Sequence, residues 1–297
     1  MKILVTGASG LVGSKLTQEL IRNNFEVVVF TRNPESYREK VKLPVEVVST
    51  LGPELIETID AIIALAGENI GSSRWTDSKK KLVLKSRVEG INGLKYAMSS
   101  AKKFPKIFIS ASAIGIYDQD GFLKEVCDQW EEAIFNVYSF YKNKQECRIV
   151  AIRTGVVMSL HGGALSKMIV PFKFGLGGIL GNGEQYVSWI HEDDLIKIYI
   201  LAINNSELKG AIDAVAPHPV TNKELTKTLG SLLHLPTLFP VPAFMLKIIL
   251  GEMSSLLLNS CKITPEKIIQ YGMIFDHPRI TEALKALGVG EVKKFQK

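Results

Sequence analysis

Six short apolar runs, rich in valine and isoleucine, alternate with segments of helical periodicity over the first half of the chain. The runs cover residues 2–6, 26–30, 45–49, 60–65, 106–110 and 147–153. Strands that are apolar on both faces are typical of a parallel sheet covered by helices on both sides. The segments at about 11–23, 77–101 and 122–140 have the apolar spacing of amphipathic helices. This alternation predicts an α/β fold with a doubly wound parallel sheet.

The character of the sequence changes further along the chain. It becomes glycine-rich after residue 156, and from residue 216 onward it has a helical pattern interrupted by prolines. We therefore expect a sheet domain over residues 1–215, in which 156–187 contribute to a substrate cleft. A smaller, mainly helical domain is expected over 216–297.

Charge and cysteine content argue against several classes of protein. The net charge is only +6, and the densest basic cluster, at 79–87, fits a solvated helix face better than a nucleic-acid site. Three cysteines without a CxxC pair indicate a reducing compartment. The strand pattern begins at Lys2, which predicts no signal peptide, and charges at Lys247 and Glu252 make 241–259 typical of a buried helix pair rather than a membrane span. We expect a cytoplasmic monomer or homodimer without nucleic-acid or membrane partners.

Three glycines follow the first apolar run and open the first predicted helix, in the stretch TGASGLVG. Gly7 allows a tight turn, Gly10 lets a pyrophosphate approach the main chain, and Gly13 brings the helix against the strand. The N–H groups at the positive end of the helix then bind the pyrophosphate. In this strand–turn–helix context the glycines favour a dinucleotide site over the alternative, a structural turn without a ligand.

The end of the second run distinguishes between the two nicotinamide cofactors. NAD binding usually needs an Asp or Glu there to hold the ribose hydroxyls, but this chain has Thr31 and Arg32. A guanidinium can bind a 2′-phosphate through paired hydrogen bonds, so NADP is the expected cofactor; the alternative is a solvent-exposed arginine. Leu65, Ala66 and Gly67 follow the fourth run, where the chain would pass the adenosine.

With these residues in view, the chain resembles the short-chain dehydrogenase/reductase superfamily, in particular an atypical branch of the extended type called epimerase-family proteins. These resemble NAD-dependent epimerases and dehydratases and carry a C-terminal domain of unknown function. The resemblance covers nearly the whole chain, through TGASGLVG (6–13), LAGENI (65–70), KSRVEG (85–90), SASAIGIY (110–117), WEEA (130–133), RTGVVMSLHGGAL (153–165), GLGGILGNGEQYVSWIHEDDL (175–195), APHPVTNKEL (216–225) and VPAFMLKIILGE (241–252). It implies a Rossmann-type NADP-binding fold and a small-molecule substrate, such as a nucleotide sugar or another carbonyl compound.

The resemblance also implies roles for single residues. It adds six to the expected cofactor site: Ser9, Leu11, Val12, Arg87, Ser110 and Arg153. Ser112 matches the position at which extended members polarise the substrate oxygen. His191 matches a position beside the substrate cleft, although it can equally cap the helix that follows it.

Ordinary extended members move the proton with a Tyr-x-x-x-Lys pair, and Tyr138 and Lys142 have that spacing. We expect this pair to be non-catalytic. It falls near the end of the helix predicted over 122–140, displaced by ~24 Å from the helix start, whereas the catalytic tyrosine belongs in the first turns. Alignment through WEEA places Leu123 and Cys127 there instead, and neither has the required chemistry.

Tyr117, five residues after Ser112, is the expected substitute proton donor, unless it only packs at the nicotinamide end. Two functions stay open. The first is an NADP(H)-dependent oxidoreductase or nucleotide-sugar epimerase of unknown substrate. The second is a non-catalytic NADP(H)-binding redox sensor or partner-binding protein, since the loss of the Tyr–Lys pair puts acid–base catalysis of about 10²–10⁴-fold at risk.

Overall fold

The computed structural model describes residues 1–137 and 147–291, so the pair Tyr138 and Lys142 lies outside the described residues. The chain forms two compact units, each assembled from separate segments. The first unit comprises residues 1–69, 80–153 and 196–212, and the second comprises 70–79, 154–195 and 213–297. Within the described part of the chain, no helix has the length and apolar character needed to cross a membrane.

The first unit is built on a seven-stranded sheet with the order β10-β6-β5-β4-β1-β2-β3. Its strands are β1 (Lys2–Thr6), β2 (Glu26–Phe30), β3 (Glu46–Val48), β4 (Ala61–Ala64), β5 (Ile107–Ala113), β6 (Arg148–Thr154) and β10 (Gly210–Ala214). β1 pairs in parallel with β2 and with β4, and parallel pairing continues from β2 to β3 and from β4 to β5. The predicted parallel sheet is confirmed, and each of the six apolar runs forms a strand.

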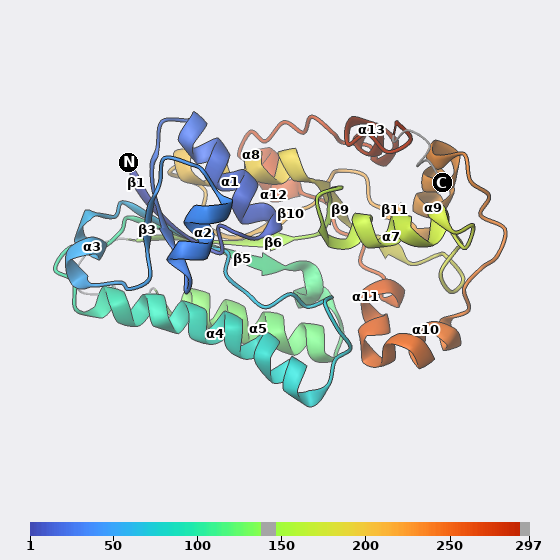
Figure 1. The fold of residues 1–297 in the computed structure, drawn as a ribbon, viewed down its shortest axis with the longest axis horizontal. Coiled ribbons are helices and arrows are strands. Elements are labelled where there is room, and N and C mark those ends of the chain that lie inside the picture. The colour runs from blue at the N-terminus through green and yellow to red at the C-terminus, as the bar shows by residue number, and fades with distance from the viewer. Residues whose placement is uncertain (138–146, 292–297) are drawn as a thin grey trace. The chain divides into compact units, whose positions relative to one another are not determined.

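Helices cover both faces of this sheet. They are α1 (Leu11–Arg22), α2 (Pro34–Lys40), α3 (Pro53–Thr58), α4 (Asp77–Ser99), α5 (Phe122–Phe135) and α8 (Glu192–Asn204), with a 3₁₀ turn, η1 (Ile114–Tyr117), between β5 and α5. Figure 1 shows α4 and α5 on one face and α1 and α8 on the other. The helix predicted over 122–140 ends earlier than expected, at Phe135.

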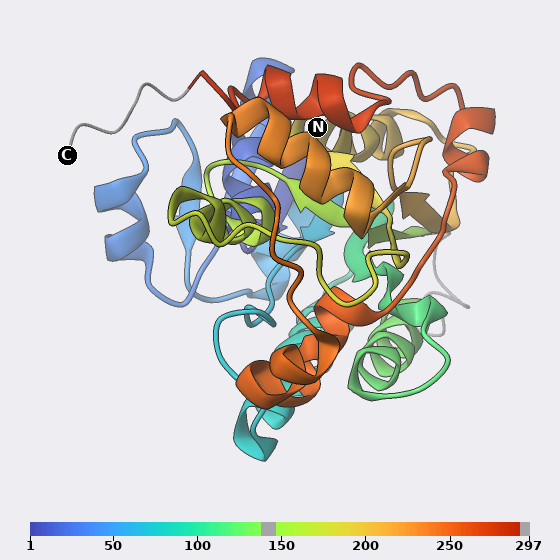
Figure 2. The same ribbon diagram turned by 90° about the vertical axis from the view of Figure 1, so that its right-hand side faces the viewer.

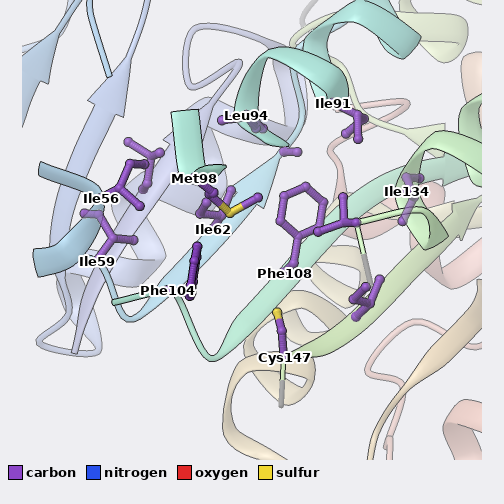
Figure 3. Packing of buried hydrophobic residues seen from close by; sticks show 14 of the residues in the cluster. Ile56, Ile59, Ile62, Ile91, Leu94, Met98, Phe104, Phe108, Ile134 and Cys147 are labelled. Atoms are coloured by element: carbon purple, nitrogen blue, oxygen red, sulfur yellow. The ribbon is translucent and has the colours of Figure 1, made fainter. Parts of the chain in front are cut away.

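A core of buried side chains joins the sheet to α3, α4 and α5. Phe108 on β5 and Ile62 on β4 are fully buried, and they pack against Ile91, Leu94 and Met98 of α4 (Figure 3). Apolar burial of this kind is the main stabilising contribution to folding. The core fixes the strands whose carboxyl ends carry the residues of interest.

The second unit contains two small strand pairs and a set of helices. β7 (Val156–Met158) runs parallel to β9 (Trp189–His191), and β8 (Tyr186–Val187) runs antiparallel to β11 (Val220–Thr221). The helical elements are α7 (Gly163–Lys173), α9 (Asn222–Leu233), α10 (Ala243–Leu250), η2 (Gly251–Ser254), α11 (Ser255–Leu258), α12 (Glu266–Gln270) and α13 (Ile280–Ala286). α9 and α13 lie side by side (Figure 2) and share a buried core.

Two surface predictions are wrong in part. The stretch 241–259 is helical, as expected, but α10 is not buried, because Phe244 and Ile248 are 64% and 70% exposed. The basic cluster at 79–87 is not wholly solvated. Lys79 is buried and donates a hydrogen bond from Nζ to Ser72 Oγ at 2.7 Å, and the Arg87 side chain also turns inward.

Candidate functional site

The glycine loop connects β1 to α1 through a turn that only glycine can form at two positions. Gly7 has a φ of +72°, and a side chain there would meet the main chain of Leu65 and Ala66 at 2.7 Å. At Gly13 an added Cβ would lie 2.1 Å from the Gly7 carbonyl oxygen. The fold itself therefore requires Gly7 and Gly13.

Gly10 differs from these two because the surrounding protein does not require a glycine there. Its φ is −78°, and an added Cβ would meet only the Gly7 carbonyl oxygen, at 3.3 Å. Gly10 is the N-cap of α1, it is exposed, and neither a side-chain cap nor an acidic residue covers the first turn. The bare main chain leaves the positive end of α1 open to an anion, which is the arrangement that a pyrophosphate requires.

The neighbouring loop residues are placed around this helix end. Ser9 is exposed, whereas Leu11 and Val12 are half-buried at the first two positions of α1. Their main-chain N–H groups belong to the first turn, where a helix has no intrahelical partners for its donors. The loop thus fits the pyrophosphate of a dinucleotide through its main chain.

Arg32 follows β2 at the same sheet edge, because Phe30 of β2 pairs with Thr6 of β1, the residue before the loop. Its side chain is exposed. Thr31 is held by a main-chain hydrogen bond to Val48. No carboxylate occupies either position, so the edge suits a phosphate better than a pair of ribose hydroxyls.

The segment after β4 passes directly under the loop. The Leu65 and Ala66 N–H groups both donate to Thr6 Oγ1 at 3.2 Å, which fixes the spacing between β1 and β4. Gly67 lies beside Arg87, whose Nη1 donates to the carbonyl oxygens of Glu68 and Val83 at 3.1 and 3.0 Å.

The Arg87 side chain is held mainly by contacts within the protein. Its guanidinium stacks over the Trp130 ring at 5.0 Å, and burial lowers its pKa. A cation placed under the 65–67 segment still contributes positive charge to this edge of the sheet.

Two serines on β5 behave differently from each other. Ser110 is fully buried and donates to the carbonyl oxygen of Ala111 at 2.9 Å, so its hydroxyl is engaged within the strand. Ser112 lies two residues further along, at the carboxyl end of β5, and its hydroxyl donates to Glu131 Oε1 at 2.7 Å. The hydrogen of Ser112 therefore points to a carboxylate, and its oxygen retains lone pairs that can accept.

Glu131 organises a chain of polar contacts that the sequence did not reveal. Arg153 at the end of β6 binds its carboxylate with two hydrogen bonds, Nε to Oε1 and Nη2 to Oε2, both 2.7 Å. The third nitrogen, Nη1, donates to the Tyr117 hydroxyl oxygen at 2.7 Å, and the guanidinium lies 5.1 Å from the Tyr117 ring centre. Hydrogen bonding to Glu131 raises the pKa of Arg153, so the guanidinium remains charged.

The structure thus brings Ser112, Glu131, Arg153 and Tyr117 together at the carboxyl end of β5. Tyr117 is 44% exposed at the end of η1, whereas Glu131 is only 6% exposed. The arrangement carries a buried negative charge, a paired cation and an accessible phenol. An arginine that donates to a phenol oxygen stabilises the phenolate more than the phenol, so this group is suited to proton transfer.

The first turns of α5 hold the residues aligned with the usual tyrosine and lysine. Leu123 Cβ and Cys127 Sγ both lie about van der Waals distance from Gly115 of η1, where an added Cβ would meet each at 3.2 Å. Burial raises the pKa of Cys127 to about 12, so the thiol is protonated at neutral pH. Neither residue can transfer a proton, and both pack beneath the turn that carries Tyr117.

His191 lies in the second unit, at the end of β9. It is 2% exposed, and its Nδ1 accepts a hydrogen bond from the Asp193 N–H at 3.1 Å. It therefore caps the first turn of α8, one of the two roles that the sequence left open.

With the geometry established, comparison with known proteins places the chain. The model of the NAD dependent epimerase/dehydratase family matches residues 3–214. The chain belongs to this family. A second model, of a domain of unknown function (DUF1731), matches residues 241–287, as the resemblance implied for the C-terminal part.

Members of the family with similar sequences occur in plants and bacteria. The chloroplastic homologue of epimerase family protein SDR39U1 from Arabidopsis thaliana is 34% identical over 97% of this chain and 86% of its own length. An epimerase family protein from Staphylococcus aureus strain MRSA252 is 31% identical over 96% of this chain and 98% of its own.

Solved structures of the family have the same fold. Human epimerase family protein SDR39U1, crystallised with NADPH, superposes with a TM-score of 0.84 at 28% identity, covering 98% of this chain and all of its own. The UDP-glucuronic acid 4-epimerase of Bacillus cereus superposes with a TM-score of 0.76 at 17% identity, covering 98% of each chain. The second comparison shows the shared fold alone.

Proposed function

We propose that this protein is an NADP(H)-dependent oxidoreductase or epimerase acting on a small carbonyl compound, with Tyr117 as the proton donor and Arg153 in place of the usual lysine. The observation that carries the proposal is the hydrogen-bonded chain from Ser112 through Glu131 and Arg153 to Tyr117. A purely structural role would not require a tyrosine hydroxyl that is exposed and also hydrogen-bonded to a buried ion pair.

The cofactor proposal rests on two features of the first unit and on one relative. The open end of α1 fits a pyrophosphate, and the bare main chain of Gly10 leaves room for it. Arg32 supplies a guanidinium where NAD-binding chains carry a carboxylate. The human relative crystallised with NADPH supports the same choice. NADPH, when bound, would supply a hydride to an electrophilic carbon, and the residues of this chain would bind the substrate and move the proton.

The protein residues then have distinct tasks. Tyr117 gives its proton to the substrate oxygen, and the Arg153 guanidinium stabilises the phenolate that remains. Glu131 holds Arg153 in the orientation at which Nη1 meets the phenol oxygen. Ser112 donates to Glu131 Oε1, the oxygen that also accepts from Arg153 Nε, and its own oxygen can act as an acceptor. For the reverse reaction the phenolate accepts the proton from a substrate hydroxyl.

This assignment places Arg153 on the catalytic side rather than at the cofactor. Its Nε and Nη2 donate to Glu131, its Nη1 donates to Tyr117, and its side chain is 21% exposed. A guanidinium differs from a lysine ammonium because its planar fork can bind a carboxylate and a phenol at once. The arginine, which lies on strand β6, can therefore stabilise the phenolate as the lysine does in ordinary members.

The experiment that tests the proposal follows NADPH oxidation at 340 nm over a panel of aldehydes, ketones, quinones and UDP-sugars, together with epimer exchange in the UDP-sugars. Turnover that depends on Tyr117 supports the enzyme. NADPH binding without turnover on any compound, in a protein that is fully folded, would instead favour a non-catalytic NADP(H)-binding protein. The replacement of the usual proton-transfer pair by Leu123 and Cys127 is the observation that keeps this second function in view.

A further inference from the structure

A cluster of side chains that could ligate a metal ion lies in the second unit, and it includes His191. His191 at the end of β9, Asp193 in the first turn of α8 and His277 between α12 and α13 each offer one ligand atom, and these atoms lie within 4.8 Å of one another. The two imidazole rings have their centres 3.8 Å apart with an angle of 42° between their planes.

The positions of these side chains are fixed by the sequence HEDD at 191–194. Asp194 is fully buried, and its two carboxylate oxygens accept the N–H groups of Asp276 and His277 at 2.8 and 3.0 Å. This carboxylate anchors the main chain that carries His277 to the first turn of α8. One short segment therefore supplies two ligands and the anchor for the third.

We propose that His191, Asp193 and His277 form a binding site for a divalent transition-metal ion of the zinc class. Two imidazoles and one carboxylate are a donor set that zinc accepts, with a fourth position left for water. The inference is independent of the proposed reaction, because all three ligands belong to the second unit and none has a role in that mechanism.

Between His191 and Asp193 the geometry requires only a small contraction around the ion. His191 Nδ1 already lies 3.6 Å from Asp193 Oδ2, and ligands about 2.0–2.1 Å from a tetrahedral zinc lie roughly 3.3 Å apart. An ion bound through Nδ1 would replace the hydrogen bond that this nitrogen accepts from the Asp193 N–H. His277 is only partly buried, so its ring can rotate toward the ion.

The surrounding charges favour a cation. Glu192, Asp194 and Asp276 lie next to the three ligands in the sequence, and Asp194 is in hydrogen-bond contact with the His277 main chain. Carboxylates around a metal site raise its affinity for a cation and orient the ligands that bind it. The charge distribution distinguishes this cluster from two histidines that merely pack together.

Zinc binding by the full-length protein tests the proposal directly. Protein treated with a chelator and then dialysed against Zn²⁺ should retain one ion per chain, measured by elemental analysis, and Zn²⁺ should raise the melting temperature. His277→Ala is expected to weaken binding at least tenfold and to abolish the thermal shift. Asp193→Asn should give a smaller loss, because it removes the charge but keeps the shape.

His218→Ala is the matched control, because His218 is an exposed histidine of the same unit. It should bind Zn²⁺ as the unchanged protein does. His277→Ala is preferred to a change at the buried His191, since a partly buried ring can be removed with less effect on folding. The proposal is overturned if the folded protein retains no Zn²⁺, or if folded His277→Ala binds it as tightly as the unchanged protein.

Discussion

Arg153, near the carboxyl end of β6, and Tyr117, in the turn that follows the neighbouring strand β5, share a hydrogen bond of 2.7 Å in which the guanidinium donates and the phenol oxygen accepts. A guanidinium has no acceptor, so this contact does not engage the Tyr117 proton itself. The arrangement therefore stabilises negative charge on the phenol oxygen while leaving its proton to be transferred elsewhere.

Removing the Tyr117 hydroxyl should test this role most directly. With a carbonyl compound that the enzyme reduces, Tyr117→Phe is expected to lower kcat by about 10²–10⁴-fold, the usual contribution of general acid–base catalysis. NADPH affinity should change little. The measurement is initial-rate kinetics at 340 nm, with Tyr96→Phe as the control, because Tyr96 is 79% exposed in the same unit. Full activity in Tyr117→Phe would exclude Tyr117 as the proton donor.

The Glu131 carboxylate should matter for stability as well as for orientation. Glu131→Gln removes a buried charge and leaves Arg153 without its partner, which costs about 3–5 kcal/mol for fully buried pairs. Because Arg153 is 21% exposed, we expect a loss near the lower end, about 3 kcal/mol, in the free energy of unfolding. Urea denaturation measures it. The exposed neighbour Glu132, changed to Gln, should lose less than about 0.5 kcal/mol.

Arg32 should decide between the two cofactors. We expect NADPH to bind at least ten times more tightly than NADH, and Arg32→Ala to erase that difference, which corresponds to about 1.4 kcal/mol. Equilibrium binding followed by cofactor fluorescence measures both. Arg22→Ala provides the control, since Arg22 is an exposed arginine at the opposite end of α1. An unchanged preference in Arg32→Ala would mean that other groups recognise the 2′-phosphate.

Gly10 and Gly13 should respond differently to alanine. Gly13→Ala places a Cβ against the Gly7 carbonyl, so the free energy of unfolding should fall by about 1–3 kcal/mol. Gly10→Ala meets no such obstacle, and we expect a loss below about 1 kcal/mol together with a large loss of NADPH affinity. Thermal denaturation and cofactor binding separate the two effects. Tight NADPH binding by Gly10→Ala would show that the pyrophosphate lies elsewhere.

Cysteine reactivity should follow burial and the pKa of each thiol. With a pKa of about 12, Cys127 is ionised to about one part in ten thousand at pH 8, and the thiolate is the reactive form. At pH 8 we therefore expect alkylation of the half-buried Cys261 and none of Cys127. Peptide mass spectrometry after iodoacetamide treatment measures this, with Cys261→Ser as control. Rapid modification of Cys127 in the folded protein would contradict it.

Much of the first unit could be predicted from the sequence because its strands are continuous apolar runs. β1, at Lys2–Thr6, matches its prediction at both ends, and the helix predicted over about 11–23 is α1, at Leu11–Arg22. The two-residue and three-residue strands of the second unit could not be found in this way. β8 and β11 are too short for any alternation of side chains to show, and their pairing depends on residues more than thirty positions apart.

The candidate site shows the same limit. The glycine loop could be recognised because its residues are consecutive and their context is local. Glu131 was missed, although one signal was present: an acidic residue lies between Trp130 and Ala133 on the buried face of α5. Its partner Arg153 lies 22 residues away on another strand, and no local pattern links the two. A pair of residues that only the fold brings together can be recognised only in the structure.

The interleaving of the two units has a consequence for how the protein is made. The chain passes between them after residues 69, 79, 153, 195 and 212, so no single cut separates one unit from the other. A nascent chain cannot complete the first unit until residues 196–212 have left the ribosome, and by then it has already released the segment 154–195 of the second. The second unit in turn needs residues 213–297, so the chain cannot complete one unit before it begins the other.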